Sequence, residues 1–111
     1  MLTRHQKIRL LDALLERYPD EVVTGYVMNA RIVSACVVGA VYQTWGYAQG
    51  EQLISGAVTQ IIQYERRWLI KTIDGDCLSI VSFVPGGRRS LLHLTTLFET
   101  AALAHSRWCV H

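Results

Sequence analysis

Two apolar runs on either side of Asp74-Gly75-Asp76 place the strongest local constraint on the fold. The run "WLIKTID" leads into the glycine and "CLSIVSFV" follows it. Glycine adopts the left-handed backbone that tight turns require, so this pattern predicts a β-hairpin. Any fold for this chain must therefore include antiparallel sheet between Trp68 and Val84.

The size and composition of the chain predict one folded domain, residues 1–111. Half of the 111 residues are hydrophobic and 18% are charged, which excludes wholesale disorder. The formal net charge of +2 is compatible with an anionic partner and does not by itself demand one. Positive charge gathers around the predicted hairpin, at Arg66, Arg67, Lys71, Arg88 and Arg89.

The cysteines and the apolar runs predict a cytoplasmic protein without a membrane span. Cys36, Cys77 and Cys109 are odd in number, widely spaced and without a CxxC pair, and no secretory leader is recognised. The most apolar run, residues 32 to 42, is too short to cross a bilayer.

Helices are predicted at both ends of the chain. Near the N-terminus, Thr3 is a suitable N-cap, Pro19 ends the pattern, and one apolar face is formed by Ile8, Leu11, Leu14 and Leu15. After "PGGRR", the segment "SLLHLTTLFETAALAHSRWCVH" predicts a closing helix whose apolar stripe consists of Leu91, Leu94, Phe98, Ala101, Ala102 and His105. We expect this helix, residues 90–108, to form a homodimer interface.

The segment from residue 22 to residue 42 has two interpretations. Its β-branched residues favour strands, "VVTGYVM" and "RIVSACVVGAVY", with a turn near Asn29 and Ala30. Its length also fits buried helices, in which Gly39 and its small neighbours would allow close packing. Periodicity does not decide between them.

Residues 44 to 67 predict two short helices capped by Thr44 and Ser55. In the second helix, Val58, Ile61 and Ile62 would share the inner side. Its outer side would be polar and would carry Gly56, Thr59, Gln60, Gln63 and Arg67.

This arrangement indicates a helix-turn-helix unit followed by a wing. Glutamine and threonine side chains can exchange hydrogen bonds with base edges in the major groove, so Thr59, Gln60 and Gln63 are the predicted base readers. The basic residues around the hairpin would contact phosphates, and these are Arg66, Arg67, Lys71, Arg88 and Arg89.

The stretch "AQGEQLISGAVTQ" resembles the reading-helix region of TrfB/KorA-type plasmid repressors, although Glu51 and Gln52 depart from that pattern. The resemblance implies that Ser55, Gly56, Thr59 and Gln60 face double-stranded DNA and that the protein is a homodimeric transcriptional regulator. The corresponding fold class is α+β, a winged helix-turn-helix-like single domain with a C-terminal dimerisation helix.

The alternative order of elements, helix, two strands, helix, two or three strands, helix, resembles Roadblock domains. That resemblance implies a three-layer α/β domain with an antiparallel sheet. Its function would be that of a non-enzymatic dimerisation or adaptor domain that binds a protein partner.

No motif in the chain predicts catalysis, a cofactor or a metal site. His93, His105, Cys109 and His111 crowd the C-terminus, but packing explains His105 better than zinc binding does. Asp74 and Asp76 are explained by the turn. Aromatic residues beside the arginines offer stacking surfaces for unpaired bases, or simply fill the core, and these are Trp45, Tyr47, Tyr64, Trp68 and Trp108.

Overall fold

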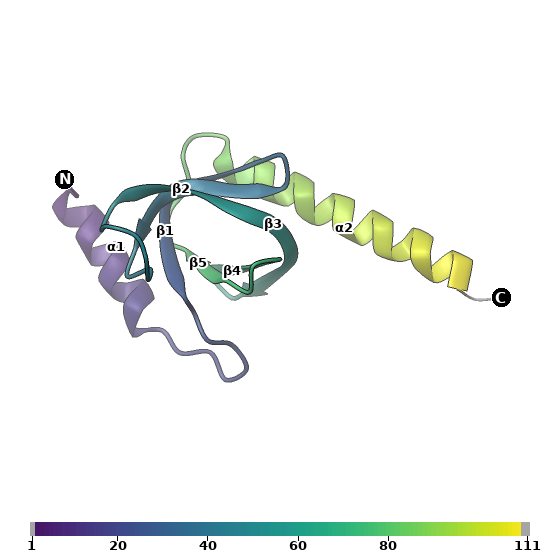
Figure 1. Ribbon diagram of the computed structural model, residues 1–111, viewed down its shortest axis with the longest axis horizontal. Helices are drawn as coiled ribbons and strands as arrows, with labels where there is room; N and C mark the ends of the chain where they lie inside the picture. The colour runs from purple at the N-terminus through teal and green to yellow at the C-terminus, as the bar shows by residue number, and fades with distance from the viewer. Residues whose placement is uncertain (1, 110–111) are drawn as a thin grey trace.

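The computed structural model describes the backbone of residues 2–109 and the side chains of residues 2–103. The described chain forms a small β-barrel with one helix at each end of the sequence (Figure 1). Its elements are α1 (Arg4–Leu15), β1 (Gly25–Val33), β2 (Cys36–Tyr42), β3 (Glu51–Tyr64), β4 (Arg67–Thr72), β5 (Cys77–Ile80) and α2 (Gly87–Cys109).

The five strands follow each other around a closed barrel in chain order. Each pair of consecutive strands is antiparallel. In such an up-and-down arrangement an odd number of strands leaves the first and last pointing the same way. Closure is therefore parallel, with Gly25 opposite Leu78 and Val27 opposite Ile80. The fold is α+β, as predicted, but neither predicted architecture is formed.

The valine-rich segment forms strands β1 and β2, so its strand interpretation is confirmed. The predicted position of its turn is wrong, because the chain reverses at Ser34 and Ala35, which both have positive φ. Two consecutive left-handed residues suit a tight hairpin. Asn29 also has a positive φ, of 55°, but it lies at an irregularity in β1 where the register shifts between Met28 and Arg31.

The predicted helix-turn-helix is wrong, because its reading helix is the second half of strand β3. A register shift between Val58 and Gln60 adds a residue to β3 opposite β4. Val58 and Ile61 consequently both reach the core, three residues apart, which imitates helical spacing. Ser55 caps no helix. It is buried within β3, where its hydroxyl accepts a hydrogen bond from Val37 N at 2.8 Å.

The Roadblock-like alternative also fails. The sheet curls into a barrel and is not a central layer between helices. Between β2 and β3, where that order requires a helix, the described chain has a loop.

The local predictions at Gly75 and at both ends of the chain are confirmed. Gly75 has a φ of 87° in the turn between β4 and β5. Thr3 caps α1 and forms a capping box with Gln6.

Three of the four residues of the apolar face predicted for the first helix point away from the barrel, and the fourth, Leu14, is half-buried. Ala13 is fully buried against Met28 and Val81, and Leu10 packs on the same cluster. Ile8, Leu11 and Leu15 are 49%, 57% and 74% exposed. The barrel contacts the face of α1 that carries fewer apolar residues.

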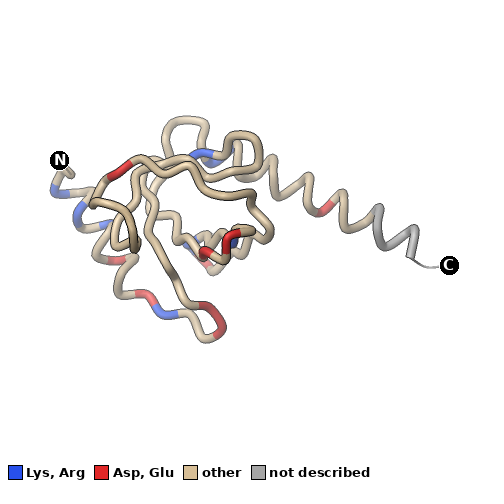
Figure 2. The backbone as a smooth tube through the Cα atoms, in the orientation of Figure 1, with Lys and Arg blue, Asp and Glu red and all other residues tan. Residues whose placement is uncertain are grey.

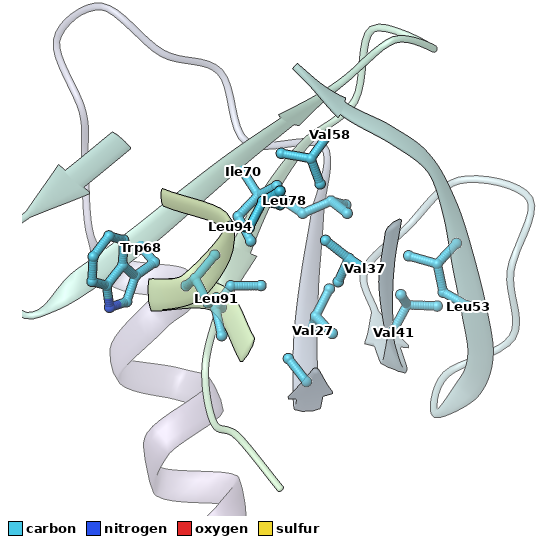
Figure 3. Packing of buried hydrophobic residues seen from close by; sticks show 12 residues of the cluster. Val27, Val37, Val41, Leu53, Val58, Trp68, Ile70, Leu78, Leu91 and Leu94 are labelled. Carbon is cyan, nitrogen blue, oxygen red and sulfur yellow. The ribbon is translucent and has the colours of Figure 1, made fainter. Parts of the chain in front are cut away.

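The main core fills the barrel and extends to the start of α2 (Figure 3). Val27, Val37 and Val41 line its interior, and Leu91 and Leu94 of α2 join them. The first turns of α2 are thus part of the core, so this end of the helix must fold together with the barrel.

Adjacent leucines on α2 provide a matched test of this anchoring. Leu91 is fully buried, whereas Leu92 is 44% exposed. We expect Leu91→Ala to lower the free energy of unfolding by about 2–5 kcal/mol, because it leaves a cavity in the core. Leu92→Ala should lower it by about 0.5 kcal/mol or less. Urea denaturation followed by circular dichroism measures both, and equal losses would contradict the packing of α2 on the barrel.

Candidate functional site

A hollow lined by arginines lies between α1, the turn from β3 to β4, and the chain that leaves β5. We call it the arginine hollow. Its polar lining is Arg9, Gln63, Glu65, Arg66, Arg67 and Arg88, and its apolar lining is Trp68, Ile80, Val81 and Phe83. A second depression, formed by Arg9, Asp12, Arg66 and Arg67, adjoins it. Segments far apart in the sequence thus bring four guanidinium groups together.

Arg67 organises the wall of this hollow and is engaged inside the protein. Its Nη2 lies 2.7 Å from Oε1 of Glu16, and its Nη1 donates to the carbonyl oxygen of Ile80 at 3.3 Å. The hydrogen bond from Arg67 outweighs partial burial and lowers the pKa of Glu16 below its usual value. Arg67 therefore joins α1 to β4 and β5.

Three other arginines of the hollow have no carboxylate partner among the described residues. Nη2 of Arg9 donates to the carbonyl oxygen of Val81 at 2.9 Å, which orients its guanidinium group. Arg66 and Arg88 are exposed. The ion pairs of the described chain are Arg67–Glu16 and Lys71–Glu21. Arg9, Arg66 and Arg88 are thus free to contact an anionic group.

Two tyrosines stand next to the arginine hollow. The rings of Tyr18 and Tyr64 lie 4.9 Å apart at an interplanar angle of 50°. Together with Arg17 and Arg66 they border a neighbouring depression. The hydroxyl of Tyr18 donates to Oε2 of Glu16 at 2.6 Å, and burial together with this carboxylate raises the pKa of Tyr18. Aromatic and cationic groups therefore form one continuous surface.

The predicted DNA contacts fall into separate places. Gln63, Arg66, Arg67 and Arg88 meet in the arginine hollow. Thr59 and Gln60 face α2, in a groove between that helix and β3. Lys71 pairs with Glu21 at 2.8 Å.

The remaining predicted contacts lie outside the hollow as well. Ser55 is buried, and Gly56 lies against Ile73 and Asp74. Arg89 is exposed but does not line the hollow. Ser55, Gly56, Thr59 and Gln60 do not share one face as they would on a reading helix. Ser55 points into the barrel, whereas Thr59 and Gln60 line the groove beside α2.

Arg9 lines the arginine hollow although it is not among the predicted contacts. In the sequence it belongs to the polar side chains of the first helix, a pattern that is typical of solvated surface. One signal was available: Arg9 lies four residues before Ala13, so it sits on the same side of the helix as the buried contact.

The other aromatic residues singled out in the sequence have different surroundings. Trp68 is 8% exposed and belongs to the core, so its ring is not a free stacking surface. Trp45 is 96% exposed in the loop between β2 and β3, away from the residues that line the hollow. The side chain of Trp108 lies outside the described residues.

Among the described residues, no cluster of three or more histidine, cysteine, aspartate or glutamate side chains could hold a metal ion. His93 is exposed on α2, whereas the side chains of His105, Cys109 and His111 lie outside the described part. None of the described helices is long and apolar enough to span a membrane.

The chain matches no protein-family model, no curated protein and no solved structure. Its function is therefore inferred from the arginine hollow and the surfaces around it.

The Glu16–Arg67 pair should make stability depend on pH. The pKa of Glu16 is lowered in the folded protein from an ordinary value of 4.5, so its contribution is present above that value and is lost as the pH falls through the folded pKa. At pH 7 we expect Glu16→Gln to lower the free energy of unfolding by about 1 kcal/mol, since this carboxylate is partly exposed.

Urea denaturation between neutral and acid pH measures this effect. The difference between wild type and Glu16→Gln should shrink below pH 4.5. The control is Glu65→Gln, at an exposed carboxylate in neither described ion pair. A difference that stays constant across the titration would show that Glu16 does not stabilise the fold through its charge.

Proposed function

We propose that this protein binds nucleic acid through the arginine hollow and that its preferred ligand is single-stranded. One observation carries the proposal: Arg9, Arg66 and Arg88 come from three separate segments and converge on one hollow without a carboxylate partner among the described residues. The proposal keeps the predicted nucleic-acid partner and replaces the predicted mode of binding.

The chemistry of guanidinium groups supports a phosphate ligand. Arginine presents a planar fork of N–H donors that matches two phosphate oxygens and keeps its charge at any physiological pH. In the arginine hollow, Arg9 is already oriented by its bond to Val81. Less side-chain freedom is then lost when a phosphate binds.

The shape of the molecule favours a single strand over a duplex. The predicted reading helix is a strand, and the outward face of α1 is apolar at Ile8, Leu11 and Leu15. The helix that was predicted to enter a major groove is therefore absent from the described chain. Beside the arginines, the partly exposed Tyr64 and Phe83 supply aromatic groups that an unpaired base could contact. A role in transcription regulation is compatible with this mode of binding.

Adjacent arginines on α2 provide the test. Arg88 lines the hollow, whereas Arg89 is exposed outside it. We expect Arg88→Ala to weaken binding of a fluorescent oligonucleotide about tenfold and to reduce the slope of log K against log salt by about 0.7. Arg89→Ala should change affinity by about twofold or less, because Arg89 does not line the hollow and salt screens its exposed charge.

Fluorescence anisotropy with single-stranded DNA, single-stranded RNA and duplex DNA measures these effects. Tighter binding of either single strand than of the duplex supports the proposal. If wild type binds none of the three at low salt, or if Arg88→Ala and Arg89→Ala behave alike, the arginine hollow is not a nucleic-acid site.

A second candidate function, that of an adaptor for a protein partner, is favoured by α1. Ile8, Leu11 and Leu15 recur at intervals of three and four residues and form an exposed apolar stripe opposite the barrel. Leu11→Asp should abolish retention of such a partner and leave oligonucleotide binding unchanged, whereas His5→Asp on the same helix should affect neither. Affinity capture with the three proteins compares them, and equal retention by all would exclude the stripe as the contact.

A further inference from the structure

Helix α2 has an anchored half and a half that extends away from the barrel. Ser90 ties its start to β1, since the hydroxyl of Ser90 accepts a hydrogen bond from Ile32 N at 2.9 Å and donates one to Gly87 O at 2.6 Å. Leu91 and Leu94 are buried in the core. Phe98 is the last residue of α2 that packs on the core. The rest of the helix extends away from the barrel (Figure 1).

The face of α2 that enters the core continues along the projecting half. Leu91, Leu94 and Phe98 are followed at the same helical spacing by Ala101 and Ala102. Ala101 and Ala102 are exposed. One continuous face is thus covered by the barrel in its first half and uncovered in its second.

The projecting half of α2 has few charged residues, as is typical of a helix that packs against another surface. From residue 90 to the end of α2 at residue 109 the sequence has two charged side chains, Glu99 and Arg107. In Figure 2 the tube of α2, after the arginines at its start, has a single red segment before the grey end. This segment corresponds to Glu99 in the sequence. Leu97 and Leu103 are 51% and 66% exposed. A helix surrounded by water normally carries charges over most of its surface.

A groove lies where the two halves of α2 meet, between this helix and strand β3. Ile61, Phe98, Ala101 and Ala102 form its apolar wall, and Gln60 and Glu99 also line it. Small side chains permit helix axes to approach to about 8 Å, so the alanines provide room for another helix.

We propose that a second copy of this chain covers the projecting half of α2, through an antiparallel crossing of two α2 helices centred on Ala101 and Ala102. Ala101 and Ala102 of the second copy bring no charge to the centre of the crossing, whereas Glu99 lies beside that centre, in the groove. The antiparallel direction places the barrels at opposite ends and lays the last turns of each α2 along the groove of the other copy. One two-fold contact then covers both projecting halves.

The size of this contact agrees with a weak but specific dimer. The part of α2 beyond Phe98 runs from residue 99 to residue 109 and is about 16 Å long. Two such half-helices, each seated partly in a groove, bury on the order of 1,000 Å², which is the lower limit for a specific interface. We therefore expect the dimer to populate at micromolar concentrations and to dissociate on dilution.

Sedimentation equilibrium between about 5 and 200 µM tests the proposal over the range expected for a weak interface. Wild type should approach twice the 12.5 kDa mass of one chain as its concentration rises. The double variant Ala101→Glu/Ala102→Glu should remain monomeric, because it places four carboxylates at the crossing. Thr96→Glu, an exposed position on another face of the same helix, should still dimerise.

Three other outcomes would contradict the proposed crossing of two α2 helices. Wild type that stays monomeric at the highest concentration shows that something else covers α2, and binding of that monomer to lipid vesicles would identify the other occupant. A double variant that still dimerises, or a trimer of wild type, places the contact elsewhere. Urea denaturation of the double variant excludes a folding defect, since both alanines are exposed and its midpoint should match that of Thr96→Glu.

Discussion

The parallel pairing of β1 with β5 is the constraint on which the rest of the structure depends. It closes the barrel, so that β1 has neighbours on both sides and contacts both helices. The neighbours of β1 also approach its backbone closely at two glycines. A side chain at Gly39 would overlap Val27 and the carbonyl of Met28, and one at Gly87 would overlap the carbonyl of Ala30. Glycine at these positions lets β2 and the start of α2 lie directly against β1.

Closure of the barrel also creates the arginine hollow. The chain leaving β5 passes beneath α1, where the carbonyls of Ile80 and Val81 accept hydrogen bonds from Arg67 and Arg9. Arg67 is ion-paired with Glu16 inside the protein, whereas Arg66, its neighbour in the sequence, is exposed. The same short segment of chain thus supplies one arginine that stabilises the fold and one that is available to a ligand.

Each helix packs part of its surface on the barrel and leaves another apolar part exposed to solvent. On α1 the barrel contacts Leu10 and Ala13, and the apolar stripe opposite stays exposed. On α2 the division runs along the axis, between a buried first half and a projecting second half. A 111-residue chain thereby carries a closed core together with apolar surface that the core does not need.

Local chemistry in the sequence determined the turn at Gly75, the capped start of α1 and the closing helix, whereas it left residues 22 to 42 open between strands and helices. These features depend on neighbouring residues alone. Only the tertiary structure decided that β3 is a strand, because the bulge at Thr59 disguises its alternation and its pairing partners lie in β2 and β4. It also decided which residues line the arginine hollow, since Arg9, Arg66 and Arg88 become neighbours only when the barrel closes.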